Sequence, residues 1–163
     1  MPSTPAPRST GAGTPSTAAA STSTASPASP SPPTPSPASP PLVAGTSIDR
    51  TAILVERLWS PSFAGCPGLR WALPPSTAVD DPSFEAKAYW RGPQWPPMTW
   101  LLWWSLVRAG HARSAGRLRA AAVDQLRTTG CTEYVDATSG EALGSDAQSW
   151  TAAVALDWLG HEA

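Results

Sequence analysis

The sequence is poor in cysteine, histidine and net charge, and each shortage excludes a class of protein. Two cysteines, Cys66 and Cys131, do not make the disulfide framework of a small secreted domain, and we expect both to be reduced thiols. The two histidines, His111 and His161, have no cysteine or carboxylate at metal-ligand spacing. They are therefore expected at the surface or at helix ends, and we predict no metal and no other cofactor. A net charge of −1 provides no basic surface for nucleic acid.

Long apolar runs are also missing. The longest covers residues 98–107, which is shorter than the roughly 20 residues that a membrane-spanning helix requires. The chain does not start with a basic segment that leads into an apolar run, as a secretion signal does. We therefore predict a cytoplasmic protein without a membrane partner.

The first 46 residues are almost free of charge and consist nearly entirely of Ser, Thr, Pro, Ala and Gly. Arg8 is the only charged residue before Asp49. Such a segment has little apolar surface to bury, so it cannot offset the entropy lost on ordering. We predict a disordered low-complexity tail over residues 1–46 and a folded part over residues 47–163. A mucin-like stalk, a linker and read-through of GC-rich non-coding DNA all remain open as its origin.

The remaining residues are rich in tryptophan and in helical periodicity. Apolar spacing predicts helices over about residues 48–59, 98–108, 112–127 and 149–159. Ser47 is expected to cap the first helix. The predicted inward faces are Ile48, Ala52, Val55 and Trp59 on the first helix, and Ala115, Leu118, Ala122 and Leu126 on the third.

The second and fourth predicted helices are apolar nearly all round, which is typical of helices surrounded by protein. Four helices of this kind do not close a core by themselves, so apolar faces would stay exposed. We infer a part of a larger helical domain, or dependence on another chain, with self-association through the exposed apolar helices as one possibility.

One short stretch, residues 89–95, combines aromatic rings, an arginine and a sharp turn. Tyr89, Trp90 and Trp95 offer flat faces of the kind that stack on a pyranose ring, and the Arg91 guanidinium can fork onto hydroxyls or a carboxylate. Gly92 and the proline after it fix a turn that aims these side chains in one direction. The stretch predicts a sugar-binding floor, and the alternative is a buried aromatic loop that only fills a core.

Several motifs follow in an order that resembles a known family. They are Asp-Asp-Pro-Ser-Phe at 80–84, Tyr-Trp-Arg-Gly-Pro-Gln-Trp at 89–95, Thr-Trp-Leu-Leu at 99–102, Glu-Tyr-Val-Asp at 133–136, Thr-Ser-Gly-Glu-Ala-Leu-Gly at 138–144 and Gln-Ser-Trp-Thr-Ala-Ala at 148–153. Together they resemble the C-terminal end of the glycoside hydrolase family 63 enzymes, closest to the mannosylglycerate and glucosylglycerate hydrolases. The resemblance implies an all-α fold, a partial (α/α)6 toroid of about four helices.

The resemblance also implies roles for individual residues. Glu133 matches the general base, which activates a water for inverting attack on the anomeric carbon of a small carbohydrate substrate. The residues that match a sugar-binding floor are Tyr89, Trp90 and Trp95, with Arg91 and Gly92 beside them. Glu141 would bond sugar hydroxyls or support its loop, and Gln148 would bind the glycerate half.

One part of the family pattern is missing. The inverting reaction needs a second carboxyl group as general acid, roughly 6.5–9.5 Å from the base. The family's acid lies in an upstream Trp-Asp motif, which this sequence does not supply. We therefore predict a C-terminal fragment of an α-glucoside or α-mannoside hydrolase that is inactive alone. The alternatives are a non-catalytic carbohydrate-binding module and a purely structural helical remnant.

Overall fold

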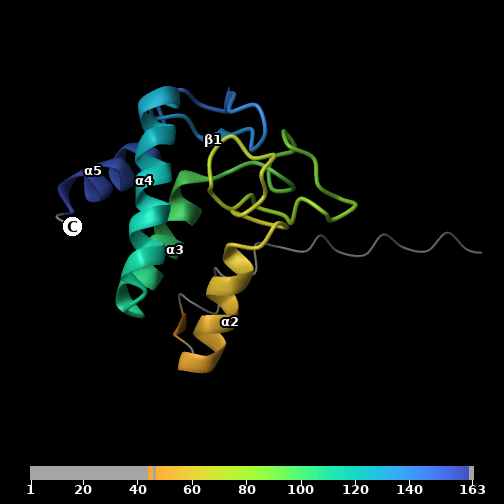
Figure 1. Ribbon diagram of the computed structural model, residues 1–163. Coiled ribbons are helices and arrows are strands. Elements are labelled where there is room, and N and C mark those ends of the chain that lie inside the picture. The colour runs from red at the N-terminus through yellow and green to blue at the C-terminus, as the bar shows by residue number, and fades with distance from the viewer. Residues whose placement is uncertain (1–43, 46, 162–163) are drawn as a thin grey trace, which may run out of the picture. The chain divides into compact units, whose positions relative to one another are not determined.

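The computed structural model describes residues 44, 45 and 47–161, whose regular structure is mainly helical (Figure 1). The predicted tail lies outside the described residues, apart from positions 44 and 45. The helices of the described part are α2 (Ile48–Leu58), α3 (Pro96–Arg108), α4 (Ala112–Thr129) and α5 (Ser149–Gly160), and its strands are β1 (Tyr134–Val135) and β2 (Ala142–Leu143). Both the first and the last residue of each helix lie within two residues of the predicted bounds, so the all-α prediction is confirmed.

The inward face of α2 differs from the predicted one. Ser47 occupies the N-cap position, but its side chain makes no capping hydrogen bond; instead the Thr51 hydroxyl donates to the Ser47 carbonyl oxygen at 3.0 Å. Ile48 is 87% exposed and Ala52 is also exposed, so placing both inward was wrong. The stripe that packs inward is centred on Thr51 and Leu58, which leaves Ile48 and Ala52 at its edge. Its partly buried members are Leu54, Val55 and Trp59.

Helix α3 is the centre of the helical core and packs against both α4 and α5. It begins with Pro96 and Pro97, whose fixed φ angles suit the first turn of a helix. His111 and His161 occupy the N-cap of α4 and the C-cap of α5, as the helix-end prediction requires. The core side chains are Leu58 from α2, Leu102, Trp103 and Leu106 from α3, Ala115, Leu118 and Ala122 from α4, and Val154 and Trp158 from α5, with Ala64, Trp71 and Leu73 from the long loop and Val135 from β1.

Both α3 and α5 keep apolar side chains at the surface. Leu156 is 74% exposed, Leu159 63% and Trp150 40%. An open groove of about 550 Å³ is lined mainly by apolar side chains of these two helices, among them Trp100 and Leu101. The prediction of exposed apolar faces is confirmed, whereas self-association through them stays a prediction.

Across the part of the chain that the structure describes, every helix falls short of the length and apolar content that a bilayer crossing requires.

The long loop between α2 and α3 and the β1–β2 hairpin lie at the same end of α3 and α4 (Figure 1). In the hairpin, Tyr134 pairs with Leu143 and Val135 with Ala142 in antiparallel register. The two segments meet at an isolated antiparallel bridge, where Gln94 and Val135 exchange backbone N–H···O bonds of 2.8 and 2.9 Å. The bridge therefore sets the distance between the loop and the hairpin.

The side chain of Gln94 extends this connection into the core. Its amide nitrogen donates to the carbonyl oxygens of Trp71 (3.2 Å) and Leu73 (2.8 Å). Its amide oxygen accepts a 2.8 Å bond from Gln125 of α4. Gln94 and Gln125 are at most 2% exposed, so water cannot replace these bonds.

Replacement of Gln125 by leucine is expected to destabilise the chain. The Gln94 amide oxygen would lose its partner while staying buried, which costs about 1–3 kcal/mol of the free energy of unfolding. Chemical denaturation of the full chain measures this loss. The control is Arg113→Ala on the exposed side of the same helix, which should leave stability nearly unchanged. Equal effects of the two substitutions would contradict the expectation.

Candidate functional site

A stack of three aromatic rings forms the centre of the candidate site. Trp90 lies parallel to Trp95, with ring centroids 3.9 Å apart and an interplanar angle of 8°. Trp95 in turn stacks on Tyr134, with centroids 4.8 Å apart. Trp95 is 1% exposed and Trp90 is 50% exposed. The surface of the stack is thus Trp90, and Trp95 supports it from beneath.

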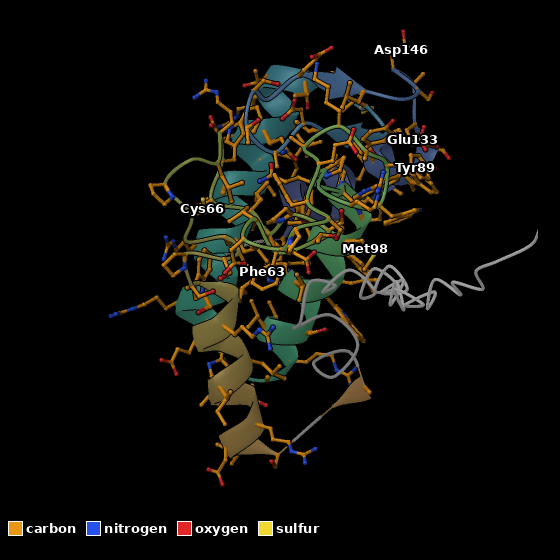
Figure 2. All side chains as sticks on the ribbon, turned by 90° about the vertical axis from the view of Figure 1, so that its right-hand side faces the viewer. Phe63, Cys66, Tyr89, Met98, Glu133 and Asp146 are labelled. Carbon is orange, nitrogen blue, oxygen red and sulfur yellow. The ribbon has the colours of Figure 1, made fainter. Side chains whose placement is uncertain are left out.

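Tyr89 connects this stack to the carboxylate of Glu133. Its ring meets Trp90, Trp95 and Tyr134 edge-on, with centroid distances of 4.8–5.7 Å. Its hydroxyl donates a 2.8 Å hydrogen bond to Glu133 Oε1, and the two side chains lie side by side (Figure 2). The bond to the carboxylate favours the protonated phenol and raises the pKa of Tyr89 above its ordinary value. The loop and the hairpin therefore bring the aromatic residues and Glu133 together.

The second oxygen of Glu133 is also held. Oε2 accepts a 3.2 Å bond from the backbone N–H of Ser145, and the Glu133 N–H donates to the Ser145 carbonyl oxygen at 2.8 Å. Gly144 lies directly against the carboxylate, where a Cβ atom would stand 2.5 Å from Oε2. Its φ of +74° also favours glycine. The orientation of Glu133 is thus fixed by the backbone of residues 144 and 145.

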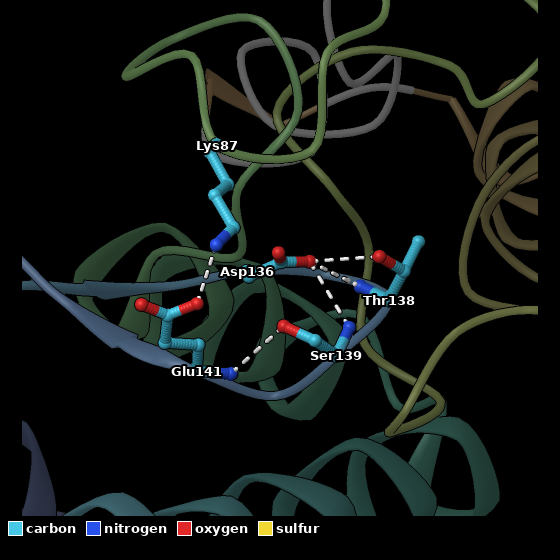
Figure 3. A network of polar contacts seen from close by, with 5 residues as sticks. All are labelled: Lys87, Asp136, Thr138, Ser139 and Glu141. Atoms are coloured by element: carbon cyan, nitrogen blue, oxygen red, sulfur yellow. Dashed lines mark hydrogen bonds and ion pairs between the residues drawn. The ribbon is translucent and has the colours of Figure 1, made fainter.

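Glu141 belongs to a separate polar network (Figure 3). It forms an ion pair with Lys87, in which both side chains are half exposed, and this hydrogen bond raises the pKa of Lys87. Close by, the buried carboxylate of Asp136 closes a turn. It accepts hydrogen bonds from Thr138 N–H and hydroxyl, both at 2.8 Å, and from Ser139 N–H at 3.1 Å. Burial alone raises the pKa of Asp136, but these hydrogen bonds outweigh it and hold the pKa below its ordinary value.

The other predicted substrate-binding residues have local partners in this structure. The Arg91 guanidinium pairs with Glu85 at 3.2 Å on the surface. Gly92 is buried in a tight turn, where a Cβ atom would lie 2.1 Å from the Glu85 carbonyl oxygen. Gln148 is the N-cap of α5, and its Oε1 accepts a 3.1 Å bond from Ser149 N–H.

The predicted residues thus divide into two groups. Tyr89, Trp90, Trp95 and Glu133 form one connected cluster, whereas Arg91, Glu141 and Gln148 are engaged with other groups. Tyr134, Lys87, Gly144 and Ser145 have no predicted role, although each contacts a predicted site residue. Tyr134 directly follows Glu133 in a quoted motif, and this adjacency was the available signal.

Solved structures with the same fold define the class. The chain superimposes on the family 63 mannosylglycerate hydrolase of Thermus thermophilus in complex with Tris and D-glycerate, with a TM-score of 0.67 and 34% identity. For the complex of that enzyme with glucose, the TM-score is 0.68 and the sequence identity is 33%. Each match covers 78% of this chain and 30% of the other. The fold is therefore part of the helical toroid of family 63 glycoside hydrolases.

The family model of the mannosylglycerate hydrolase MGH1-like glycoside hydrolase domain matches residues 33–151. The chain belongs to this family. It is 44% identical over 119 residues to the glucosylglycerate hydrolase of Mycolicibacterium hassiacum, a match that covers 73% of this chain and 27% of the relative. The chain thus spans between a quarter and a third of the length of these relatives.

Tyr89 should titrate above its ordinary pKa of 10.0. The chain has two tyrosines, so Tyr134→Phe leaves the Tyr89 ring as the only tyrosyl signal in ¹³C NMR. In this background, Glu133→Ala removes the acceptor and should move the pKa of Tyr89 down toward 10.0. Because the folded-state pKa is raised, the stabilisation by this bond is complete at neutral pH and is lost only as the pH rises through that pKa.

The matched control for this titration is Glu141→Ala. Glu141 is acidic and lies on the same hairpin, but it pairs with Lys87. This substitution should leave the titration of Tyr89 unchanged. Identical titrations of the Glu133→Ala variant and its parent would show that the bond to Glu133 does not form.

Asp136→Asn should lower stability at pH 7, because the hydrogen bonds of the turn are stronger to a carboxylate than to an amide. A depressed folded-state pKa stabilises the fold above the ordinary value of 3.8, and this contribution is lost as the pH falls through the folded-state pKa. The difference between Asp136→Asn and the unmodified chain in urea denaturation should therefore shrink below pH 3.8. A difference that is constant from pH 7 to pH 3 contradicts this expectation.

Proposed function

We propose that this chain forms the base side of a glycoside hydrolase active site, with Glu133 as general base. The observation that carries the proposal is the carboxylate fixed by Tyr89 and Ser145 beside the aromatic stack. A half-exposed indole backed by two further rings suits stacking against the apolar face of a sugar. A carboxylate in a fixed orientation at the edge of this surface suits the activation of a water molecule.

In the proposed reaction, Glu133 takes a proton from water, and the water attacks the anomeric carbon with inversion. A second carboxyl group must protonate the leaving oxygen. Asp136 is unsuited to this role, because its hydrogen bonds keep it ionised at neutral pH. Glu141 is held by Lys87. We therefore propose that the acid comes from outside the described residues and that the chain alone does not turn over substrate.

For the substrate we propose an α-glucoside or α-mannoside of glycerate. The names of the relatives support this class, and so do the glucose and D-glycerate complexes of the Thermus enzyme. In our proposal Gln148 contacts the glycerate half, because the helix cap uses its Oε1 and leaves the amide N–H groups for a ligand. Arg91 would exchange its surface partner Glu85 for sugar hydroxyls, and Glu141, paired with Lys87, would support its loop.

Trp90→Ala should weaken the binding of glucosylglycerate to the full chain. Loss of one aromatic stacking contact is worth about 0.5–1.5 kcal/mol, or about 2- to 10-fold in Kd. Ligand-observed NMR titration measures this change. The control is Trp104→Ala, which removes an indole that stacks on Trp100 of α3 and should leave affinity unchanged. Equal affinity of the Trp90→Ala variant and the unmodified chain contradicts the proposed floor.

Incubation of the full chain with glucosylglycerate should release no glucose, because the chain alone does not supply the general acid. Turnover that Glu133→Gln abolishes would overturn the requirement for an outside acid and support Glu133 as base. Turnover that survives Glu133→Gln would contradict the role of Glu133.

A further inference from the structure

Two buried threonine hydroxyls connect helix α5 to the backbone around Glu133. Thr151, which is 0% exposed, donates a 2.7 Å hydrogen bond to the carbonyl oxygen of Thr132. Thr132, 2% exposed, donates through its own hydroxyl to the carbonyl oxygen of Leu143 at 2.8 Å. The two bonds join α5 to the segment that precedes β1 and then to β2.

The peptide unit between Thr132 and Glu133 is therefore held on both sides. Its carbonyl oxygen accepts the bond from Thr151, and its N–H, which belongs to Glu133, donates to the Ser145 carbonyl oxygen at 2.8 Å. Because a peptide unit is planar, fixing both of its polar groups fixes its orientation. That orientation sets the direction in which the Glu133 side chain leaves the backbone.

Thr151 differs from other hydroxyl residues on the helices. The hydroxyls of Ser105, Thr128 and Thr129 bond to the carbonyl oxygen four residues earlier on their own helix, as is common for such residues. Thr151 instead reaches a carbonyl 19 residues away in sequence. Its bond does not serve the helix locally but links the helix to the candidate site.

We propose that Thr151, acting through the Thr132 carbonyl, is a positioning residue that aims Glu133 at the Tyr89 hydroxyl. The inference rests on the proposed function only for the catalytic role of Glu133, since the positioning itself is a property of this chain without substrate. Loss of the Thr151 hydroxyl would allow the Thr132–Glu133 peptide to rotate and would weaken the bond between Tyr89 and Glu133.

The test compares Thr151→Val, which keeps the shape and removes the donor, with Thr151→Ser, which keeps the donor. The Tyr134→Phe background makes Tyr89 the only tyrosine, and Glu133 is then the remaining titratable group that raises its pKa. We expect Thr151→Val to lower the pKa of Tyr89 toward 10.0 in ¹³C NMR titration, and Thr151→Ser to keep this pKa raised. A Thr151→Val variant that titrates like its parent overturns the inference.

Two further measurements separate positioning from general destabilisation. Thr51→Val removes another buried hydroxyl that bonds to a carbonyl, on α2, and should leave the Tyr89 titration unchanged. If Thr51→Val lowers the pKa of Tyr89 as much as Thr151→Val does, the inference fails.

The ¹³Cζ shift of Tyr89 at pH 7 reports the same hydrogen bond without exposure to alkali. Should Thr151→Val not fold, Thr151→Ala, which removes the same donor, is expected to show the same loss.

The outcome is independent of the sugar experiments. A chain that does not bind glucosylglycerate but loses the Tyr89 shift in Thr151→Val would refute the proposed function and support the positioning role. Sugar binding together with a Tyr89 titration that Thr151→Val leaves unchanged would support the proposed function and refute the positioning role.

Discussion

The bridge between Gln94 and Val135 is the constraint on which the candidate site depends. Trp95 directly follows Gln94, and Tyr134 directly precedes Val135, so the register of this bridge sets the stacking of Trp95 on Tyr134. A shift by one residue would turn these side chains to opposite sides. The buried bonds that Gln94 accepts from Gln125 and donates to Trp71 and Leu73 oppose such a shift, because breaking them would leave polar atoms without partners in the core.

The polar interactions around the site fall into two kinds with different consequences. Bonds between buried neutral groups, such as those of Gln94, Thr132 and Thr151, fix the backbone and have no access to water. The ion pairs Lys87–Glu141 and Arg91–Glu85 lie at the surface, where such pairs contribute little to stability. Apart from the buried carboxylate of Asp136, the buried polar contacts around the site are therefore neutral, and the ion pairs lie at the surface, where exchange of partners costs little.

Much of this architecture could be predicted from the sequence, but its polar connections could not. Apolar periodicity located all four helices of the described part, because their bounds follow from proline, glycine and the 3.6-residue period. The inward face of α2 was misjudged because two apolar residues, Ile48 and Ala52, lie at the edge of the buried stripe. Gln125 continues the buried face of α4, and no pattern marks a buried glutamine whose partner is 31 residues away in sequence. Motif order indicated Glu133 and its aromatic neighbours, whereas the bonds that orient the carboxylate come from backbone groups of residues 144 and 145.

The exposed apolar face and the aromatic stack have one residue in common. Trp150 lines the groove between α3 and α5, and its ring also meets Trp95 edge-on with centroids 6.2 Å apart. The next residue, Thr151, holds the peptide unit before Glu133. In the first turn of α5, Trp150 therefore lines the groove and contacts the stack, and Thr151 contacts the segment that carries Glu133. Because packed side chains transmit displacement rather than absorb it, a displacement of Trp150 would also shift Trp95, which lies beneath Trp90. The groove and the candidate site therefore share residues of a single helical turn.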